Sequence, residues 1–440
     1  MKKTAFLLCH LLLATTTACG ATERQPDAPA GGAEPNLASS AAQSQASNQP
    51  VEIEFWYPYS GVAGETVEEL VRRFNASQND VVVKAVFQGD YYENHAKVLA
   101  AIPAGNQPDV TIVEIASIGA FAQPGALEDL TPYVERDKVD LNDYWPGLML
   151  NSYWNGKLVA LPFFRSTPIM YMNVTMLKEA GLDPSGPKTW EELREYARAL
   201  TVKEKRWGFT TPIDIWFYEA LVFQSGGSIL SDDGTRVLFH SPEGVAPVKF
   251  WKEMIEEGIM KFPPGEKYNA WQVADTDFFN QQVGLMFQST GGLAGRLRQA
   301  EGKFELGTAF LPKNKEYGVP TGGANIVILS KSDKKEAAWT FVKWITSTEQ
   351  TAFASMQTGY LPTSKSAAET PEMKKWFEEM PQFKVALDQL AYARPRPMVP
   401  AYKEMQELIM TELQRAVIST NLPPEQVIAE AAAKAEKLLR

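Results

Sequence analysis

From Val51 onward, stretches with the two-residue period of a strand alternate with stretches that have the period of a helix. The first, VEIEFW, predicts a strand because Ile53 and Phe55 alternate with polar residues. The next, GETVEELVRRFNAS, places its apolar residues on one face of a helix. Strands separated by helices of about 10 to 15 residues indicate parallel βαβ units. The alternation therefore predicts an α/β fold.

The alternation continues along the chain, and the C-terminal third has mainly helical patterns. Further helices are predicted in YENHAKVLAAIPAG, TWEELREYARAL and KKEAAWTFVKWITSTEQTAFASMQ. Thr189 and Glu192 stand at capping-box spacing in the second of these. Further strands are predicted in VVVKAVFQG, PDVTIVEI, GKLVALPFF, TPIMYMNVTML, VGLMFQST, FELGTAFLP and GGANIVILS.

The length and charge of the chain limit the classes of protein to consider. Its 440 residues are too many for one compact core, so two domains of α/β size are expected. The formal net charge is −10, and the sequence has no basic cluster. These features argue against a nucleic-acid binder and against a basic membrane-surface protein.

The N-terminal segment MKKTAFLLCHLLLATTTACG has two lysines, an apolar stretch and then small residues. This is the layout of a secretory signal, and the apolar stretch is too short for a membrane-spanning helix. Cys19 and the residues around it resemble a bacterial lipobox, although Thr16 stands where leucine is usual. The resemblance implies that 1–19 is a lipoprotein signal peptide and that Cys19 is lipidated. Ordinary cleavage nearby is the alternative.

Residues 20–50 are rich in Ala, Ser, Gln, Pro and Gly, and contain no aromatic residue. Such a segment cannot bury enough apolar surface to offset its ordering entropy, so it is predicted to be a flexible tether. The two cysteines, Cys9 and Cys19, both precede it. The exported body is therefore expected to have neither disulfides nor thiol chemistry.

Ten segments follow one another between residues 51 and 440: IEFWYPYSG, RFNASQNDVVV, GNQPDVTIVE, NGKLVALPF, STPIMYMN, LKEAGLDPSGPKTWEEL, VGLMFQST, GGANIVILS, AAWTFVKWITSTEQ and TGYLPTSKSA. In this order they resemble the extracellular solute-binding proteins of bacterial ABC importers. The resemblance is to the clade that includes carbohydrate binders and glycerol-3-phosphate binders.

The resemblance implies a two-lobed, periplasmic-binding-protein-like α/β fold, with a ligand cleft between the lobes and a helical C-terminal region. Carried onto this chain, lobe 1 comprises 51–162 and 327–361. Lobe 2 comprises 163–326 and 362–440. The chain is expected to cross between the lobes near Pro162-Phe163, Asn325-Ile326 and Leu361-Pro362.

Candidate ligand residues stand where predicted strands end, because open α/β sheets bind ligands at the carboxyl ends of their strands. Trp56, Tyr91 and Glu114 close the first three predicted strands. Trp216 and Tyr218 lie in TTPIDIWFYEA, which is predicted to be irregular.

The resemblance to the glycerol-3-phosphate binders implies a pocket of tyrosine, glutamate, serine, tryptophan, glycine and arginine. Trp216 or Tyr218 takes the place of the tryptophan, without a clean match. The arginine is Arg394 or Arg396, and Arg396 is preferred. The remaining positions fall on Tyr91, Glu114, Ser166, Ser289, Gly323 and Tyr360.

The chemistry of these residues suits two kinds of ligand. Arg396 offers the planar donors that match a phosphate. Ser289 and the backbone of Gly291 and Gly292, at a predicted helix start, offer further donors for an anion. Aromatic faces such as Trp56 or Trp216 suit a sugar ring instead. A glycerophosphate is therefore the first prediction, and a di- or oligosaccharide is the alternative.

A secreted carbohydrate-active hydrolase is the alternative from another class. Carboxylate pairs such as Asp275 and Asp277 could hydrolyse a glycoside, but their polar sequence context favours solvated charge. The three histidines are far apart, and no nucleophile elbow, P-loop or dinucleotide fingerprint occurs. We therefore expect no catalytic residue, metal or cofactor.

Together the patterns predict an exported, lipid-anchored binding protein on the outer face of the cytoplasmic membrane. Its expected partners are a small polar solute and the transmembrane subunits of an ABC permease, and it is expected to be a monomer that binds no nucleic acid. The solute is predicted to be captured by hinge closure and delivered to the permease.

Overall fold

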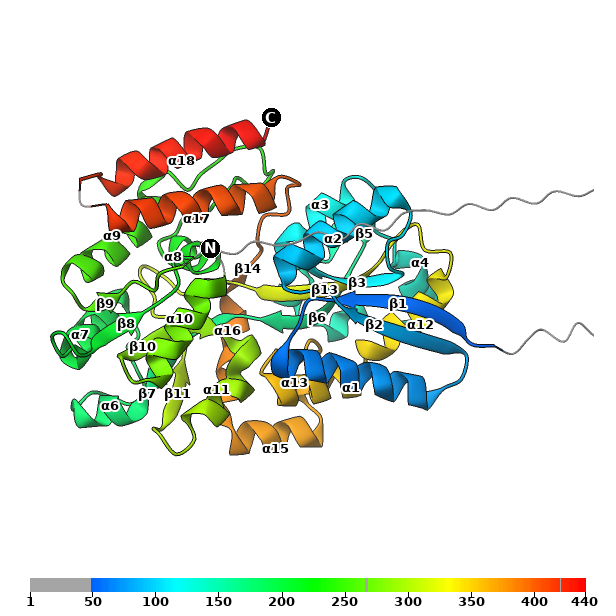
Figure 1. Ribbon diagram of the computed structural model, residues 1–440, viewed down its shortest axis with the longest axis horizontal. Coiled ribbons are helices and arrows are strands. Elements are labelled where there is room, and N and C mark those ends of the chain that lie inside the picture. The colour runs from blue at the N-terminus through cyan, green and yellow to red at the C-terminus, as the bar shows by residue number, and fades with distance from the viewer. Residues whose placement is uncertain (1–48, 266–267, 420) are drawn as a thin grey trace, which may run out of the picture. The chain divides into compact units, whose positions relative to one another are not determined.

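Two five-stranded sheets organise the part of the chain that the computed structural model describes, residues 49–265, 268–419 and 421–440 (Figure 1). Residues 49–440 form one unit by their internal contacts. The predictions for the signal peptide 1–19, and for nearly all of the tether 20–50, lie outside the described residues. In the described part, no helix has the length and apolar character needed to cross a membrane.

The first sheet has the strand order β2-β1-β3-β13-β6. Strand β1 pairs in parallel with both β2 and β3, and helices α1 (Gly61–Ser77) and α2 (Tyr91–Ala104) connect them in sequence. The predicted βαβ units are therefore confirmed. Strand β13 pairs antiparallel with β3 and β6. The strands are β1 Val51–Tyr57, β2 Val81–Phe87, β3 Val110–Glu114, β6 Leu161–Ser166 and β13 Gly322–Ile328.

The second sheet has the strand order β11-β7-β10-β8-β9. Strand β8 is parallel to β10 and β9, whereas β7 is antiparallel to β10 and β11. The strands are β7 Pro168–Asn173, β8 Trp207–Thr210, β9 Met260–Lys261, β10 Val283–Ser289 and β11 Leu306–Ala309. Two further strand pairs are β4 Tyr153–Trp154 with β5 Lys157–Leu158, and β12 Val319–Pro320 with β14 Ala393–Arg394.

Helices cover both sheets, and α17 and α18 pack side by side against the second-sheet half (Figure 1). The remaining helices are α3 Ile118–Ala122, α4 Thr131–Arg136, α5 Pro146–Met149, α6 Val174–Glu179, α7 Trp190–Leu200, α8 Ile215–Gln224, α9 Pro242–Glu256, α10 Tyr268–Phe279, α11 Leu293–Ala300, α12 Lys335–Ile345, α13 Thr348–Thr358, α14 Lys365–Ala368, α15 Pro371–Glu379, α16 Lys384–Gln389, α17 Tyr402–Ile418 and α18 Pro424–Leu438. Five 3₁₀ turns complete the described elements: Ile115–Ser117, Leu141–Asp143, Thr290–Gly292, Pro381–Phe383 and Leu390–Tyr392.

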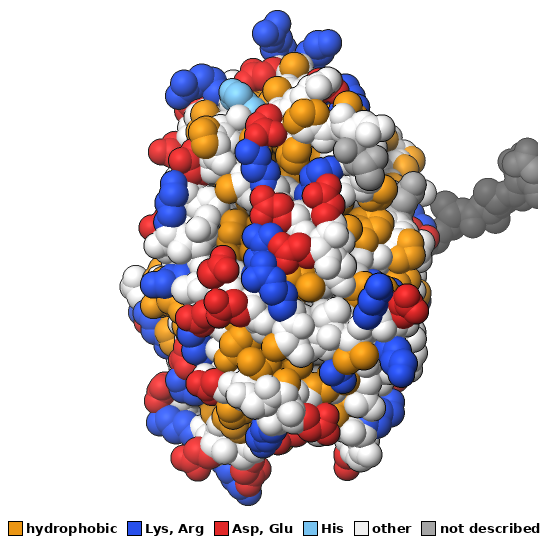
Figure 2. All heavy atoms as spheres, turned by 90° about the vertical axis from the view of Figure 1, so that its left-hand side faces the viewer, with side chains coloured by type: hydrophobic (Ala, Val, Ile, Leu, Met, Phe, Trp, Pro, Cys, Tyr) orange, Lys and Arg blue, Asp and Glu red, His pale blue; other side chains and the backbone are white. Residues whose placement is uncertain are grey.

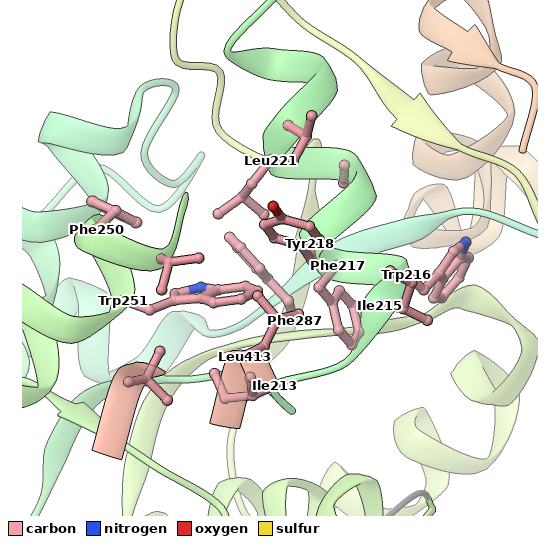
Figure 3. Close-up of a cluster of buried hydrophobic side chains, with 14 of the residues drawn as sticks. Ile213, Ile215, Trp216, Phe217, Tyr218, Leu221, Phe250, Trp251, Phe287 and Leu413 are labelled. Carbon is pink, nitrogen blue, oxygen red and sulfur yellow. The ribbon is translucent and has the colours of Figure 1, made fainter. Parts of the chain in front are cut away.

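Helix α8 lies where the sequence predicted an irregular stretch, and that prediction was wrong. All ten residues of α8 are buried. A helix buried on every side shows no amphipathic period in its sequence, so the pattern could not reveal it. Figure 3 shows part of this burial: Phe217, Tyr218 and Leu221 of α8 lie close to Trp251 of α9 and Leu413 of α17.

Two other predicted elements were corrected by the structure. The single long helix predicted from Lys334 is two helices, α12 and α13, which are separated at Thr346 and Ser347. The Thr346 hydroxyl donates back to the carbonyl of Val342 (2.8 Å), a local bond that competes with continuing the helix. The predicted strand TPIMYMNVTML stops at Asn173, whose side chain caps α6.

Arg165, the last but one residue of β6, joins the segments that run between the two sheets. It is fully buried, and burial lowers its pKa to about 9. The backbone N–H of Leu361 donates to the Arg165 carbonyl (2.8 Å). The guanidinium donates to four uncharged oxygens: the carbonyls of Gly322 (3.0 Å) and Leu148, the Asn325 side chain (3.0 Å) and the Thr321 hydroxyl (2.7 Å).

The surface of the second-sheet half carries charges of both signs. In Figure 2, basic and acidic side chains are interspersed over the face that includes α7 and α9. Arg194 and Arg198 of α7 pair there with Glu253 (2.9 Å) and Glu257 (3.0 Å). This face therefore lacks the single-signed field of a nucleic-acid-binding surface.

Candidate ligand-binding site

A cavity of about 280 Å³ lies at strand ends from both sheets. Glu114 ends β3 and Ser166 ends β6 in the first sheet, whereas Ser289 ends β10 in the second. The cavity is thus placed as predicted for an α/β protein. Its wall is formed by Tyr91, Tyr92, Glu114, Ser166, Asp214, Ile215, Trp216, Trp271, Gln288, Ser289, Gly291, Gly292, Arg296, Gly322, Gly323, Tyr360, Arg396, Lys403 and Gln406.

Eight of the ten residues predicted to bind ligand line this one cavity. They come from segments up to about 300 positions apart in the sequence, and only the fold brings them together. The eight are Tyr91, Glu114, Ser166, Trp216, Ser289, Gly323, Tyr360 and Arg396.

The other two predicted residues, Tyr218 and Trp56, do not line the cavity. Tyr218 is fully buried in the core, and its hydroxyl donates to the Gly244 carbonyl (2.8 Å). In Figure 3 its ring lies among the core side chains, whereas Trp216 is at the edge of the cluster and its ring points away from Trp251. The indole N–H of Trp56 donates to the Glu54 carboxylate on the same strand. Neither side chain therefore belongs to the wall that the other eight share.

Arg396 is held by two carboxylates. Its Nε and Nη2 donate to the two carboxylate oxygens of Glu219 (2.7 and 3.1 Å), and Nη1 donates to Glu114 Oε1 (2.6 Å). Burial raises the pKa of Glu219, whereas the Arg396 charge acts against that rise. Arg394 instead donates to the Gly227 carbonyl (3.0 Å) and is absent from the cavity wall. The structure thus places Arg396 at the cavity.

The β10 end is built around a second arginine. Ser289 Oγ accepts the Gly291 N–H (3.1 Å), so this N–H, predicted as an anion donor, already has a partner. Arg296 Nη1 donates to the Ser289 carbonyl (3.1 Å), and its Nε and Nη2 donate to the two Asp275 oxygens (2.9 and 2.8 Å). The prediction of a solvated Asp275 was wrong, because the sequence does not show that α10 faces α11.

The Asp277 carboxylate, also predicted to be solvated, is buried on the other side of α10. It accepts a hydrogen bond from Lys261 Nζ (2.7 Å). Asp275 and Asp277 thus have separate basic partners, which is not the arrangement of a hydrolytic carboxylate pair.

Tyrosine rings form the first-sheet side of the cavity. The Tyr91 hydroxyl donates to the Tyr59 hydroxyl (3.0 Å). The Phe164 ring stacks on Tyr360 with 4.7 Å between centroids. Burial raises the pKa of Tyr360 to about 12, so its hydroxyl stays protonated and can both donate and accept hydrogen bonds.

Two tryptophans form the opposite wall. The rings of Trp216 and Trp271 stack at 6.0 Å, and the Trp216 N–H donates to the Thr321 carbonyl (3.2 Å). A Cβ on Gly322 would come within 2.4 Å of the Trp216 ring, so this close approach requires glycine. The Trp271 N–H donates to Asp214 Oδ2 (3.2 Å), while Asp214 Oδ1 caps α8.

Lys403, in the first turn of α17, is the third basic residue of the cavity wall. Its Nζ lies 3.6 Å from the centroid of the Tyr92 ring, which comes from α2. Burial lowers the pKa of Lys403.

Sequence patterns did not predict six residues of the cavity wall. All but one of them project from helices or strand interiors, and only tertiary packing directs their side chains toward the cavity. The six are Lys403, Asp214 (the exception), Trp271, Gln288, Arg296 and Gln406.

The cavity combines hydroxyls, both signs of charge and aromatic faces, which is the lining of a site for a small polar solute. Among the described residues, no group of three or more His, Cys, Asp or Glu side chains is placed to hold a metal ion. The fold and the cavity together define a cleft-type binding protein.

Comparisons with known proteins agree with this class. Residues 69–382 match the family described as bacterial extracellular solute-binding protein. The chain is 25% identical over 412 residues to the sn-glycerol-3-phosphate-binding periplasmic protein UgpB of Escherichia coli K12, covering 88% of this chain and 92% of the relative. The chain therefore belongs to the bacterial extracellular solute-binding proteins, the family that supplies ABC importers with their substrates.

Solved structures of similar proteins have the same two-lobed fold. UgpB from Mycobacterium tuberculosis in complex with glycerophosphocholine has a TM-score of 0.79 and 26% identity, covering 88% of this chain and 98% of that one. The cyclic α-maltosyl-1,6-maltose binding protein from Arthrobacter globiformis has a TM-score of 0.75 and 25% identity, covering 89% and 99%. The predicted two-lobed α/β fold is thereby confirmed.

Proposed function

We propose that this solute-binding protein captures a glycerophosphate, either sn-glycerol-3-phosphate or a glycerophosphodiester, and delivers it to the permease of an ABC importer. One observation carries the proposal: seven residues assigned by resemblance to the glycerol-3-phosphate binders line a single cavity. Two relatives support it: the sn-glycerol-3-phosphate-binding protein UgpB of Escherichia coli K12, and the Mycobacterium tuberculosis UgpB solved in complex with glycerophosphocholine. The seven are Tyr91, Glu114, Ser166, Ser289, Gly323, Tyr360 and Arg396.

The size and polarity of the cavity also favour a small ligand. A volume of about 280 Å³ is at the lower limit of ligand pockets, which span roughly 300 to 1,000 Å³. Arg396 has five N–H donors, and the contacts with Glu114 and Glu219 use three of them. The other two, together with the Tyr360 and Ser166 hydroxyls, can serve a phosphate or a glycerol hydroxyl.

A di- or oligosaccharide is the second candidate solute. The stacked rings of Trp216 and Trp271 present the aromatic surface on which the apolar face of a sugar can pack. A solved relative that binds cyclic α-maltosyl-1,6-maltose supports this alternative. The transport role is the same for either solute.

The proposed mechanism is hinge closure of two lobes, with lobe 1 at 51–162 and 327–361 and lobe 2 at 163–326 and 362–440. The ligand contacts groups from both lobes, and so binds the closed arrangement more tightly than the open one. A preference of this kind shifts the open–closed balance by the ratio of the two affinities. We propose that the chain acts by binding alone, as a monomer and without catalysis.

The proposed location is the outer face of the cytoplasmic membrane, with lipidated Cys19 as the anchor and residues 20–50 as the tether. Growing the producing bacterium with a radiolabelled fatty acid tests this. We expect label in the wild-type chain and none in Cys19→Ser, whereas a labelled Cys19→Ser would contradict the assignment.

Calorimetric titration of the chain from residue 20 onward tests the proposed solute. The ligands are sn-glycerol-3-phosphate, glycerophosphocholine, maltose and trehalose. We expect a glycerophosphate to bind in the micromolar range or tighter. Tyr360→Phe should weaken it about fivefold to tenfold through one lost hydrogen bond, whereas the control Tyr392→Phe, which alters an exposed tyrosine, should not.

Binding of a sugar without binding of either glycerophosphate would replace the first candidate by the second. Binding of none of the four ligands would overturn both.

A further inference from the structure

The three basic residues that line the cavity differ in the groups that balance their positive charge. Arg296 makes two hydrogen bonds to the Asp275 carboxylate (2.9 and 2.8 Å). Arg396 makes two to Glu219 and one to Glu114. Both guanidinium groups therefore already face carboxylates, which offset much of their attraction for an incoming anion.

Lys403 differs from the two arginines because an aromatic ring, and not a carboxylate, contacts its charged group. Its Nζ lies over the Tyr92 ring, 3.6 Å from the centroid. Within the described parts of the chain, no carboxylate forms an ion pair with this ammonium group at 4.0 Å or less. A cation over an aromatic face is attracted only weakly, whereas a desolvated ammonium with a phosphate oxygen makes a stronger, charge-assisted hydrogen bond. The ring contact is thus one that an anion can replace.

The surroundings of Lys403 act on its charge in both directions, and burial is the largest effect and disfavours the charged form. Glu114 of β3, Asp214 before α8 and Glu407 of α17 favour its charged form at longer range, whereas Arg396 opposes it. An anionic group in the cavity would add to the favourable side of this balance.

Lys403 is also placed to act in closure. It comes from the first turn of α17, which packs in the second-sheet half, and its ring partner comes from α2 beside the first sheet. Both residues line the cavity, so the contact between them crosses it. An anion bound at this point would therefore touch both halves of the molecule.

We propose that Lys403 is the residue that gives this cavity its preference for an anionic solute: its ammonium group exchanges the face of Tyr92 for an oxygen of the ligand phosphate. The proposal rests on the proposed function, because it assigns the charge-selecting role within the same site. It also shifts that role away from Arg396, whose main part is then to fix Glu114 and Glu219 in place.

Titration of four proteins with sn-glycerol-3-phosphate and with maltose tests the proposal: wild type, Lys403→Met, Lys403→Arg and the control Lys97→Met. Lys97 is an exposed lysine of α2 that does not line the cavity. We expect Lys403→Met to bind sn-glycerol-3-phosphate at least tenfold more weakly than wild type. Lys403→Arg and Lys97→Met should stay within about threefold, and Lys403→Met should change any maltose affinity by less than threefold.

The outcomes separate the two hypotheses. Equal sn-glycerol-3-phosphate affinity of wild type and Lys403→Met overturns the role of Lys403 and leaves the proposed function standing. A loss that is as large in Lys403→Arg as in Lys403→Met also overturns it, because the charge is then not the cause. A wild type that binds no glycerophosphate overturns both. Thermal unfolding of each variant shows whether a weaker affinity comes from an unfolded protein.

Discussion

His95 on α2 has an imidazole whose protonation the fold opposes. Its Nδ1 is buried without a hydrogen-bond partner, and its ring lies edge-on to Phe121 at 5.0 Å. Burial, with a smaller effect from the Lys403 charge, lowers the pKa of His95 to about 4, whereas the value in an unfolded chain is about 6.5. The unfolded state therefore binds a proton over a range of pH in which the folded state does not.

This difference predicts a loss of stability in mild acid. The free energy of unfolding should fall as the pH drops from about 6.5 to about 4, by at most about 3 kcal/mol from this residue. His95→Gln should remove that part of the pH dependence, and His240→Gln, at an exposed histidine, should not. Denaturant unfolding at pH 7 and at pH 4.5 measures it. The same acid loss in all three proteins would assign the effect to other groups.

Single residues were predictable where short motifs mark strand ends. Ser166 and Ser289 stand at such ends, Tyr91 begins the helix after β2, and the structure brings all three to one cavity. Lys403 was not predictable, since nothing in PAYKEMQEL indicates which side of the helix meets α2. Tyr218 was wrongly predicted because a tyrosine near a glycine-rich cavity and a tyrosine bonded inside a core look alike in sequence.

Elements were predictable where their burial was one-sided or their ends were marked. Thr189 caps α7 as its spacing predicted, accepting the Glu192 N–H (3.2 Å). The Glu192 carboxylate, however, accepts the Lys188 N–H (2.6 Å) and does not complete the capping box. Helix α8 was missed because it is buried on every side, which is a property of the packing and not of a periodic sequence.

Asp214 caps the N-terminus of α8, and removing this cap should measurably lower the free energy of unfolding. Asp214 accepts the Trp216 backbone N–H (2.9 Å) and the Trp271 indole N–H (3.2 Å). Asp214→Ala should therefore lower the free energy of unfolding of the ligand-free protein by about 1 to 2 kcal/mol. Asp214→Asn retains a capping oxygen and should lose less than half of that. Urea unfolding compares them, and equal losses in the two variants would show that the carboxylate charge matters more than the cap.

The backbone conformation of Gly323 determines how strand β13 pairs with β6. Gly323 has φ of +77°, and a Cβ there would lie 1.9 Å from the Phe164 carbonyl oxygen of β6. The register of β13 against β6 shifts between Gly323 and Asn325, so the chain bulges at the cavity wall. The two glycines in TGGANIV indicate an unusual backbone conformation at this position, but the bulge itself depends on pairing with β6 and could not be predicted from the sequence.

At the scale of the whole molecule, the two sheets should unfold together. Arg165 makes hydrogen bonds to residues of 321–325 and to Leu361, in the segments that run between the two sheets. We expect one cooperative transition by tryptophan fluorescence and by circular dichroism. A glycerophosphate at 100 times its dissociation constant should raise the free energy of unfolding by about 2.7 kcal/mol across that single transition. Two transitions, only one of which moves with ligand, would contradict this coupling.

The hydrogen bonds of Arg165 also determine where a fluorescent reporter domain can be inserted to make a sensor from such a protein. A reporter domain inserted at 321–325 would remove acceptors from a buried cation, which is destabilising. One inserted next to 361 would disturb the hydrogen bond from the Leu361 N–H to the Arg165 carbonyl. The turn between Val202 and Arg206 holds none of these partners and is closed by its own backbone bonds. An insertion there leaves the junction of the two halves intact, so that the proposed closure on ligand binding can still reach the reporter.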